Sequence, residues 1–176
     1  MCHDVTVPAQ RDHIDRFLDE LEPVEGLDYE VEGIVDRIGG INRRIKRGME
    51  ATLSQFGLSL PDWQVLSTLR NSGSRTPGVL ARYLELSSGA MTSRLDALER
   101  AGHIRRVPDP EDRRSVLIEI TDAGRAAWEK AATIQARKEA FFASALTKTE
   151  QRRLNALLRK LMLALEAIER SNGSGG

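Results

Sequence analysis

The sequence predicts a mainly helical α+β fold. Apolar residues recur at every third or fourth position over most of the 176 residues, which is the spacing of amphipathic helices. The period changes to two at residues 103–107 and 115–120, which predicts two short strands. Residues 108–114 between them (PDPEDRR) form a polar, charged segment, so the strands are expected to make a β-hairpin with a charged tip.

Two helices are expected before residue 57. Residues 12–21 carry apolar side chains at helical spacing, and Pro23 and Gly26 end this segment. A longer helix is predicted from about residue 28 to 56, and Gly39-Gly40 in its middle indicates close approach of another backbone or a bend. The apolar stripe of this helix consists of Val31, Ile34, Ile38, Ile41, Ile45, Met49 and Leu53.

Three shorter helices follow, and each has a start signal. Residues 59–62 (SLPD), 76–77 (TP) and 87–89 (SSG) each place a Ser or Thr cap before the helix, twice with a proline in the first turn. The third helix is expected to run to about residue 101, where Gly102 closes it. Helix, short helix, helix and hairpin, in this order, make a winged helix-turn-helix.

Two more helices are expected after the hairpin. Thr121-Asp122 caps the first, and Thr147 with Glu150 has capping-box spacing and opens the second. The apolar stripe of the second consists of Leu154, Leu157, Leu158, Leu161, Leu165 and Ile168. This stripe and that of the long N-terminal helix exceed what a winged helix needs as cover, and monomers rarely expose such patches, so a homodimer is expected.

The domain organisation follows from these elements. We predict N-terminal dimerisation helices over residues 10–56 and a DNA-binding lobe over residues 57–125. C-terminal dimerisation helices are expected over residues 126–170, and a disordered tail over residues 171–176.

The charge distribution favours a polyanionic partner. Lysine and arginine together number 26, as do aspartate and glutamate, but residues 1–40 hold eleven acidic and three basic side chains. The rest of the chain therefore carries a net charge of +8, which favours nucleic acid; ordinary solvated surface charge is the alternative.

The third short helix has the character of a recognition helix. Its apolar side (Met91, Leu95, Leu98) leaves small polar residues facing outward, and Arg94 is expected to reach guanine edges in the major groove. At the hairpin tip, arginines suit a narrow minor groove, with a neighbouring aspartate to orient one guanidinium. The predicted DNA-binding residues are Arg75, Thr76, Ser87, Ser88, Ala90, Thr92, Ser93, Arg94, Asp112, Arg113 and Arg114. The alternative is a winged helix that binds a small molecule or a protein without specific DNA binding.

Residues 60–128 resemble the MarR family of bacterial transcriptional regulators. The resemblance rests on residues 76–81 (TPGVLA), residues 87–102 (SSGAMTSRLDALERAG) and above all the hairpin. The family's hairpin signature, Asp-x-Arg followed by five residues and Leu-Thr, falls on Asp112, Arg114, Ile120 and Thr121, with Ile in place of Leu. The resemblance implies a homodimeric, ligand-responsive regulator, a repressor, that binds a pseudo-palindromic DNA operator.

The extra N-terminal helix resembles the branch of this family that includes urate-responsive and TamR-like members. That branch holds a purine with a tryptophan of the extra helix, an acid after the position of Trp63 and an arginine of the recognition helix. These positions are Leu21, Gln64 and Arg94 here. Because two of the three differ, the resemblance implies a related anionic or aromatic metabolite rather than urate. The expected effector residues are Leu21, Trp63, Gln64 and Arg94, although a place in the core is the commoner one for Trp63.

Other chemistries lack the residues they need. One cysteine, Cys2, cannot make a disulfide framework, no run of 18 apolar residues exists and the N-terminus does not resemble a secretory signal, so a cytoplasmic bacterial protein is expected. Cys2, His3, His13 and His103 match no standard metal spacing, and oxidation sensing at Cys2 stays a minor alternative. Neither a catalytic set nor a nucleotide-binding motif occurs, so no enzyme activity and no cofactor are expected.

Overall fold

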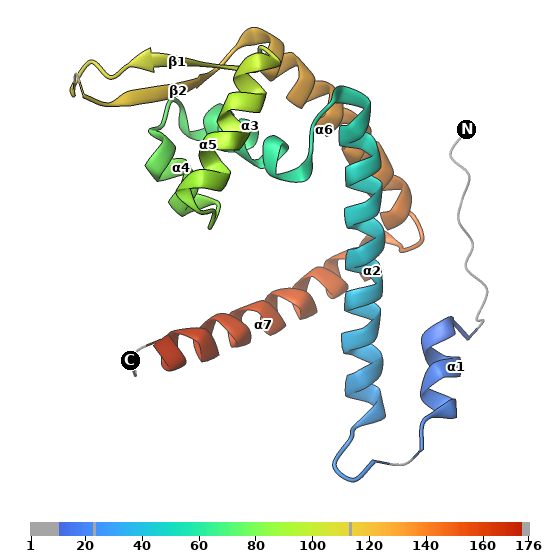
Figure 1. Cartoon of the computed structure of the whole chain (residues 1–176). Coiled ribbons are helices and arrows are strands. Elements are labelled where there is room, and N and C mark those ends of the chain that lie inside the picture. The colour runs from blue at the N-terminus through green and yellow to red at the C-terminus, as the bar shows by residue number, and fades with distance from the viewer. Residues whose placement is uncertain (1–10, 23, 113, 174–176) are drawn as a thin grey trace. The chain divides into compact units, whose positions relative to one another are not determined.

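The computed structural model describes residues 11–22, 24–112 and 114–173, and divides the chain into two compact units (Figure 1). The first unit comprises residues 11–136, and the described part of the second comprises residues 137–173. The predicted fold class is confirmed: the described part of the chain is mainly helical and carries one two-stranded hairpin. No helix within the described residues has the length and apolar character needed to cross a membrane.

The first unit begins with α1 (His13–Glu20), which packs against the start of α2 (Tyr29–Leu53) (Figure 1). Asp12 caps α1 by accepting the backbone N–H groups of Ile14 and Asp15 at 2.8 and 3.0 Å. Arg37 of α2 bonds the carboxylates of Asp12 (3.0 Å) and Asp15 (2.5 Å), so α1 is attached to α2 by charge as well as by apolar contact. Gly33 leaves room for this contact, because a Cβ at that position would stand 2.8 Å from the Arg37 guanidinium and the end of that side chain would have to shift.

α2 passes through Gly39-Gly40 as one uninterrupted helix. Of the two alternatives left by the sequence, close approach of another backbone is absent within the described residues, because a Cβ on either glycine would meet only the side chains of Arg43 and Arg44 within 4 Å. Arg44 folds back along the helix and donates to the Gly40 carbonyl at 3.1 Å. The helix ends in a 3-10 turn, η1 (Ser54–Phe56), which Gly57 closes at a φ of +65°, a conformation that favours glycine.

The winged helix-turn-helix lobe consists of α3 (Leu60–Ser72), α4 (Pro77–Tyr83), α5 (Ser88–Arg100), β1 (Ile104–Pro108) and β2 (Val116–Ile120). Ser59, Thr76 and Ser87 cap the three helices as predicted. β1 and β2 are antiparallel, with Ile104 opposite Ile120 and Pro108 opposite Val116. The backbone of Arg75, between α3 and α4, adds a bridge to Ile118.

One apolar core holds this lobe together. Its fully buried large side chains come from the end of α2, from all three lobe helices and from both strands: Leu53, Val65, Leu66, Leu80, Met91, Leu95, Ile104 and Ile118. Each such side chain contributes about 1.5–3 kcal/mol of burial free energy. The core therefore fixes the backside of α5 and the base of the hairpin while leaving their opposite surfaces uncovered.

α6 (Asp122–Ala143) starts directly after the hairpin and is fastened to it. The hydroxyl of Thr121 donates to the Gly102 carbonyl at 2.6 Å and accepts the N–H of Gly124 at 3.1 Å. A Cβ on Gly124 would stand 2.0 Å from the carbonyl oxygen of His103, so only glycine allows the helix to begin this close to the strand.

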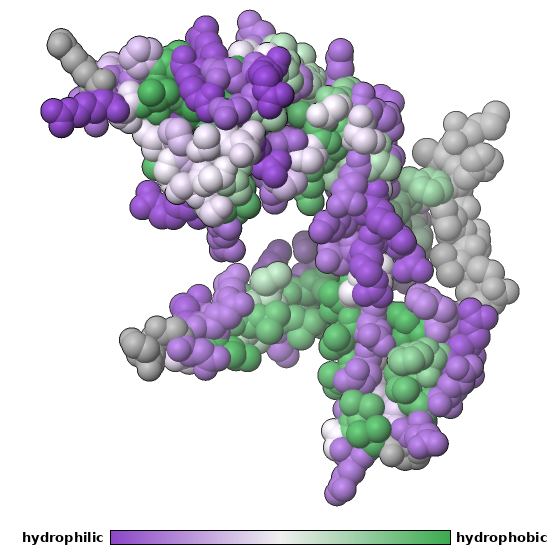
Figure 2. All heavy atoms as spheres, viewed as in Figure 1, coloured by the Kyte–Doolittle hydropathy of each residue, from purple (hydrophilic) through white to green (hydrophobic). Residues whose placement is uncertain are grey.

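The second unit contains the end of α6 and α7 (Lys148–Gly173). The predicted capping box is present: Glu150 accepts the N–H of Thr147 at 2.7 Å and donates its own N–H to the Thr147 hydroxyl at 3.3 Å. The apolar stripe of α7 is exposed along the whole helix (Figure 2). The helix continues three residues beyond the predicted end at residue 170, and the Ser171 hydroxyl bonds the Ile168 carbonyl at 2.7 Å. Residues 171–173 are thus helical instead of part of a tail, and residues 174–176 lie outside the described part of the chain.

Candidate nucleic-acid interface

The first half of α5 presents small polar side chains to solvent. Ser87 caps the helix by accepting the Ala90 N–H at 3.2 Å, and Met91, Leu95 and Leu98 are buried below it. The side chains of Ser88, Ala90, Thr92 and Ser93 are exposed, as the sequence predicts. The Thr92 hydroxyl is occupied, because it donates to the Ser88 carbonyl at 2.9 Å. Because these exposed side chains are short, this side of α5 can approach a base edge closely.

Arg94 lies elsewhere than predicted. Its guanidinium points to the first turn of α3, where Nη1 donates to Asp62 at 2.6 Å and to the Ser59 hydroxyl at 3.0 Å. The reason is angular: Arg94 is three residues after Met91 and one before Leu95, so it borders the buried side of α5. Its partner Asp62 was not among the predicted site residues, although an acid in the first turn of α3 is the sequence signal that could have suggested it.

Arg75 and Thr76 hold the turn between α3 and α4. The backbone of Arg75 exchanges two hydrogen bonds with Ile118, at 2.8 and 3.3 Å, and its Nη1 donates to the Ser74 carbonyl at 2.8 Å. The Thr76 hydroxyl caps α4 by accepting the Val79 N–H at 3.4 Å. Both side chains are half-buried, so their first role is to shape the lobe.

Tyr83, the last residue of α4, is an exposed aromatic side chain that the sequence analysis missed. It is 71 % exposed although α4 packs on α5. Its spacing of three residues from Leu80 is that of the apolar side of α4, so the sequence pattern gave no signal of its exposure. An exposed tyrosine beside a recognition helix can donate to a phosphate or stack on a sugar.

The hairpin tip is organised by Asp112. Its carboxylate accepts the backbone N–H of Arg114 at 2.9 Å, and its carbonyl accepts the Ser115 N–H at 2.8 Å. The carboxylate thus shapes the turn, because a side-chain oxygen two residues before an N–H closes a local ring readily. That Asp112 also orients a guanidinium stays a prediction. The Arg114 side chain is exposed, and Arg113 lies outside the described residues.

This geometry agrees with the comparisons with known proteins. Residues 58–116 match the sequence profile of the MarR family. Over 135 residues the chain is 33 % identical to the HTH-type transcriptional regulator PecS of Dickeya dadantii, covering 75 % of this chain and 81 % of PecS. The chain belongs to the MarR family. It is accordingly a DNA-binding transcriptional regulator with a winged helix-turn-helix, and the family is not one of enzymes.

Solved MarR-family structures share the fold. Wild-type MarR from E. coli in its apo form matches with a TM-score of 0.63 and 27 % identity, over 81 % of this chain and 98 % of that one. A point mutant of MepR from Staphylococcus aureus, bound to an oligodeoxyribonucleotide, matches with a TM-score of 0.59 and 23 % identity, over 75 % and 97 % of the two chains. The likeness to MepR is one of fold.

The four residues predicted to bind an effector in this MarR-family chain do not form one group. Leu21 ends α1, beside the Tyr29 end of α2, whereas α3 packs near the Leu53 end (Figure 1). Gln64 is exposed. Trp63 is stacked on Trp128 of α6, with ring centroids 5.5 Å apart and planes 11° from parallel. Arg94 pairs with an acid next to Trp63. That acid is Asp62, which precedes the tryptophan, whereas the urate-responsive branch has its acid at the position of Gln64, which follows it.

The Trp63–Trp128 stack joins α3 to α6. The Trp128 indole N–H donates to the Ser67 hydroxyl at 2.5 Å, and the Arg70 guanidinium lies 4.3 Å from the centre of the Trp128 ring. Cation–π contacts and aromatic stacking each contribute about 0.5–1.5 kcal/mol in such settings. Trp63 therefore has a structural role, the commoner of the two that the sequence left open.

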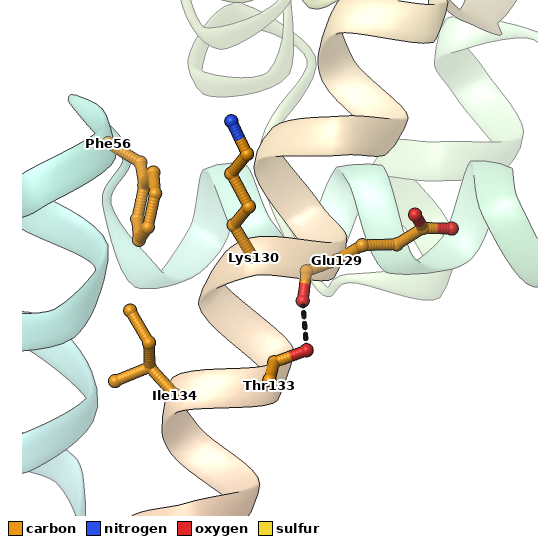
Figure 3. A pocket seen from close by; sticks show the side chains of 5 residues that line it. All are labelled: Phe56, Glu129, Lys130, Thr133 and Ile134. Carbon is orange, nitrogen blue, oxygen red and sulfur yellow. Dashed lines mark hydrogen bonds between the residues drawn. The ribbon is translucent and has the colours of Figure 1, made fainter.

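A shallow groove of about 400 Å³ lies between η1 and the middle of α6. Figure 3 shows the Phe56 ring and Ile134 facing one another, with the Lys130 side chain beside them. Glu129 and Thr133 complete the lining, and the Thr133 hydroxyl is occupied by the Glu129 carbonyl at 2.9 Å. The groove thus offers an aromatic face, an aliphatic face and one ammonium group.

Metal ligands do not cluster in the part of the chain that the structure describes: no three His, Cys, Asp or Glu side chains there could hold an ion together. Cys2 and His3 lie outside it, so the alternative of oxidation sensing at Cys2 has no structural description.

Proposed function

We propose that the chain is a homodimeric, effector-responsive regulator that binds a pseudo-palindromic operator with α5 in the major groove and the hairpin at a minor groove. The observation that carries this proposal is the exposed polar first half of α5, capped at Ser87 and backed by a fully buried apolar side. A helix presented in this way fits the width of the major groove. The MepR mutant, which shares the fold, is bound to an oligodeoxyribonucleotide, and this supports DNA as the partner here.

Each predicted contact has a distinct task in this mode. Ser88, Ala90 and Ser93 line the groove-facing side of α5, where hydroxyls can donate to or accept from base edges. Arg114 at the hairpin reaches the minor groove, because arginine is weakly hydrated and suits its negative potential. Arg113 shares that task by its place in the sequence. Thr76 and Arg75 stand near the phosphates, whereas Arg94 stays with Asp62.

The partner in the dimer is a second copy of this chain. On α2 the residues Val31, Ile34, Ile38, Ile41 and Ile45 are 40–52 % exposed although they form one stripe. On α7 the six-residue leucine and isoleucine stripe is exposed in the same manner. A two-fold dimer buries such stripes and places two recognition helices about 34 Å apart, one turn of DNA.

The effector is an anionic aromatic metabolite, and the groove of Phe56, Lys130 and Ile134 is its proposed site. A flat ring fits between Phe56 and Ile134, and the Lys130 ammonium pairs with a carboxylate. The groove lies on α6, one turn after Trp128, which is stacked on the lobe. A ligand there acts where the lobe joins the helix that leads to the second unit, so it can shift the spacing of two lobes.

The helix α1 before α2 supports placing the chain in the branch with urate-responsive and TamR-like members. An operator partner also implies that the protein acts in the bacterial cytoplasm. With a dimer covering its site, repression by exclusion of the polymerase is the expected direction of control.

Genomic-fragment selection tests the proposal directly. Fragments of the source genome captured by the purified protein are footprinted, and a two-fold symmetric protected site is the expected result. Binding of duplex DNA with no preferred sequence would contradict operator recognition and favour the alternative of a winged helix without specific DNA binding.

Effector binding is tested separately with benzoate as the probe. Saturating benzoate should weaken operator binding in the wild type and have less effect in Lys130→Ala, while Lys160→Ala on α7 serves as the charge-matched control. An equal response of all three proteins would remove the groove from the proposal.

A further inference from the structure

Arg106 on β1 joins the hairpin to α5. Its Nη2 donates to the Asp96 carboxylate at 2.6 Å, and its Nη1 donates to the Glu99 carboxylate. Its backbone N–H also donates to Glu99, at 3.1 Å. One residue of the hairpin therefore makes three hydrogen bonds to two acids that lie three residues apart on the recognition helix.

The guanidinium can fix the orientation of the hairpin relative to α5 as well as the distance between them. It is planar and rigid, so bonds to two separate carboxylates fix its plane relative to α5. The backbone of Arg106 is also fixed, because it pairs on β2 with Ile118, whose side chain is fully buried in the core. The hydrogen bond that Arg106 donates to Asp96 raises the pKa of Arg106 further above its ordinary value, so the guanidinium stays charged.

The two acids also explain why a cation is needed at this place. Asp96 and Glu99 stand on the helix that enters the DNA groove, where unpaired carboxylates would repel phosphates. Arg106 binds both carboxylates and offsets one of their two negative charges, so its guanidinium is fully engaged. Its side chain is therefore not available as a DNA contact.

We propose that Arg106 is a positioning residue for operator binding: it sets the angle between the hairpin and α5, so that Arg114 and the first half of α5 reach adjacent grooves together. The inference rests on the proposed function, since it needs both elements to touch DNA. Arg105 provides a matched control. It is the preceding residue on β1 with the same charge, but it pairs within the hairpin, with Glu119 at 2.7 Å.

A double-mutant cycle tests the positioning role. Arg114→Ala should weaken operator binding about tenfold in the wild type and less than about twofold in an Arg106→Gln background. In an Arg105→Gln background it should again cost about tenfold. An undiminished cost of Arg114→Ala in Arg106→Gln would overturn the proposal. Thermal melting of each variant shows that the lobe is folded, and Arg106→Lys, which can keep one of the two bonds, should give an intermediate value.

The variant Asp96→Asn/Glu99→Gln separates positioning from simple electrostatics. It removes two negative charges from the recognition helix, so charge alone predicts tighter DNA binding with Arg114 as effective as before. Loss of positioning predicts that Arg114→Ala becomes nearly silent, as in Arg106→Gln. The former result would overturn the role of Arg106.

Amide hydrogen exchange of the free protein makes the two proposals distinguishable. If Arg114→Ala alone does not change operator binding, the contact of Arg114 with DNA in the proposed function is wrong. The attachment of the hairpin to α5 can still be measured without DNA: amide exchange over residues 104–120 should accelerate in Arg106→Gln and not in Arg105→Gln. Equal exchange in the two variants would refute the attachment itself.

Discussion

The carboxylate of Asp62 and the guanidinium of Arg94 lie 2.6 Å apart and join the first turn of α3 to the middle of α5. The two side chains are only 16 and 23 % exposed, and the Ser59 hydroxyl completes the group. At its far end the same helix is held by Arg106. α5 is thus held by ion pairs in its middle and in its second half, beyond its exposed polar residues, and the two pairs together set its orientation.

Separating Asp62 from Arg94 should destabilise the lobe. In a cycle of Asp62→Asn and Arg94→Gln, followed by urea unfolding, we expect a coupling free energy of about 1–3 kcal/mol, because the shielded pair is weakly screened by solvent. The pair Arg105–Glu119, with Arg105 largely exposed, is the control and should couple by less than about 1 kcal/mol. Equal coupling in both pairs would show that Asp62 and Arg94 do not fix α5.

Arg114 should account for a measurable share of operator affinity. Arg114→Ala is expected to cost about 1–3 kcal/mol in a gel-shift titration. If the guanidinium also meets a phosphate, the slope of log affinity against log salt should fall by about one. Arg159→Ala, on the side of α7 away from its apolar stripe, removes the same charge without this effect. A salt dependence that is flat between roughly 50 and 200 mM would argue against phosphate contacts altogether.

Local signals predicted most of the fold. The caps at Ser59, Thr76 and Ser87 and the capping box at Thr147 depend on side chains within three residues of the groups they bond. The apolar side of α5 followed from spacing alone. Features that depend only on residues close together in the sequence can therefore be predicted from the sequence.

The site was predicted less well because its bonds are long-range. Arg94 meets an acid 32 residues earlier in the chain, and Trp63 meets a tryptophan of another helix, Trp128. The spacing of apolar residues along the sequence does not predict pairs of this kind. Arg106 is a further case: a strand arginine beside a recognition helix looks like a DNA contact until Asp96 and Glu99 are seen to engage it.

The attachment of α1 should depend on pH only in strong acid. The N–H of Asp15, with help from the Arg37 guanidinium and the N–H of Ile14, lowers the pKa of Asp12 from 3.8 to about 2. A carboxyl whose pKa is lowered in the folded chain contributes stability above its ordinary pKa, and this contribution is lost as the pH falls through about 2. An NMR titration of the Asp12 carboxyl should show that midpoint, and contacts between Leu18 and Gly33 should persist at pH 4. Asp12→Asn should remove the step; a midpoint near 4 in the wild type would mean that Asp12 is not engaged in the folded chain.

The apolar stripe of α7 should determine the oligomeric state. Leu161 is 47 % exposed, so a charge there costs little in a single chain, whereas at a dimer interface it would be buried without a partner. We therefore expect Leu161→Asp to halve the mass measured by sedimentation equilibrium at micromolar concentration and to abolish symmetric operator protection. Arg159→Glu, on the opposite side of the same helix, should leave the mass and the footprint as they are. Two results would each be incompatible with pairing through α7: a wild-type protein that sediments as a stable single chain, or a Leu161→Asp variant that stays dimeric.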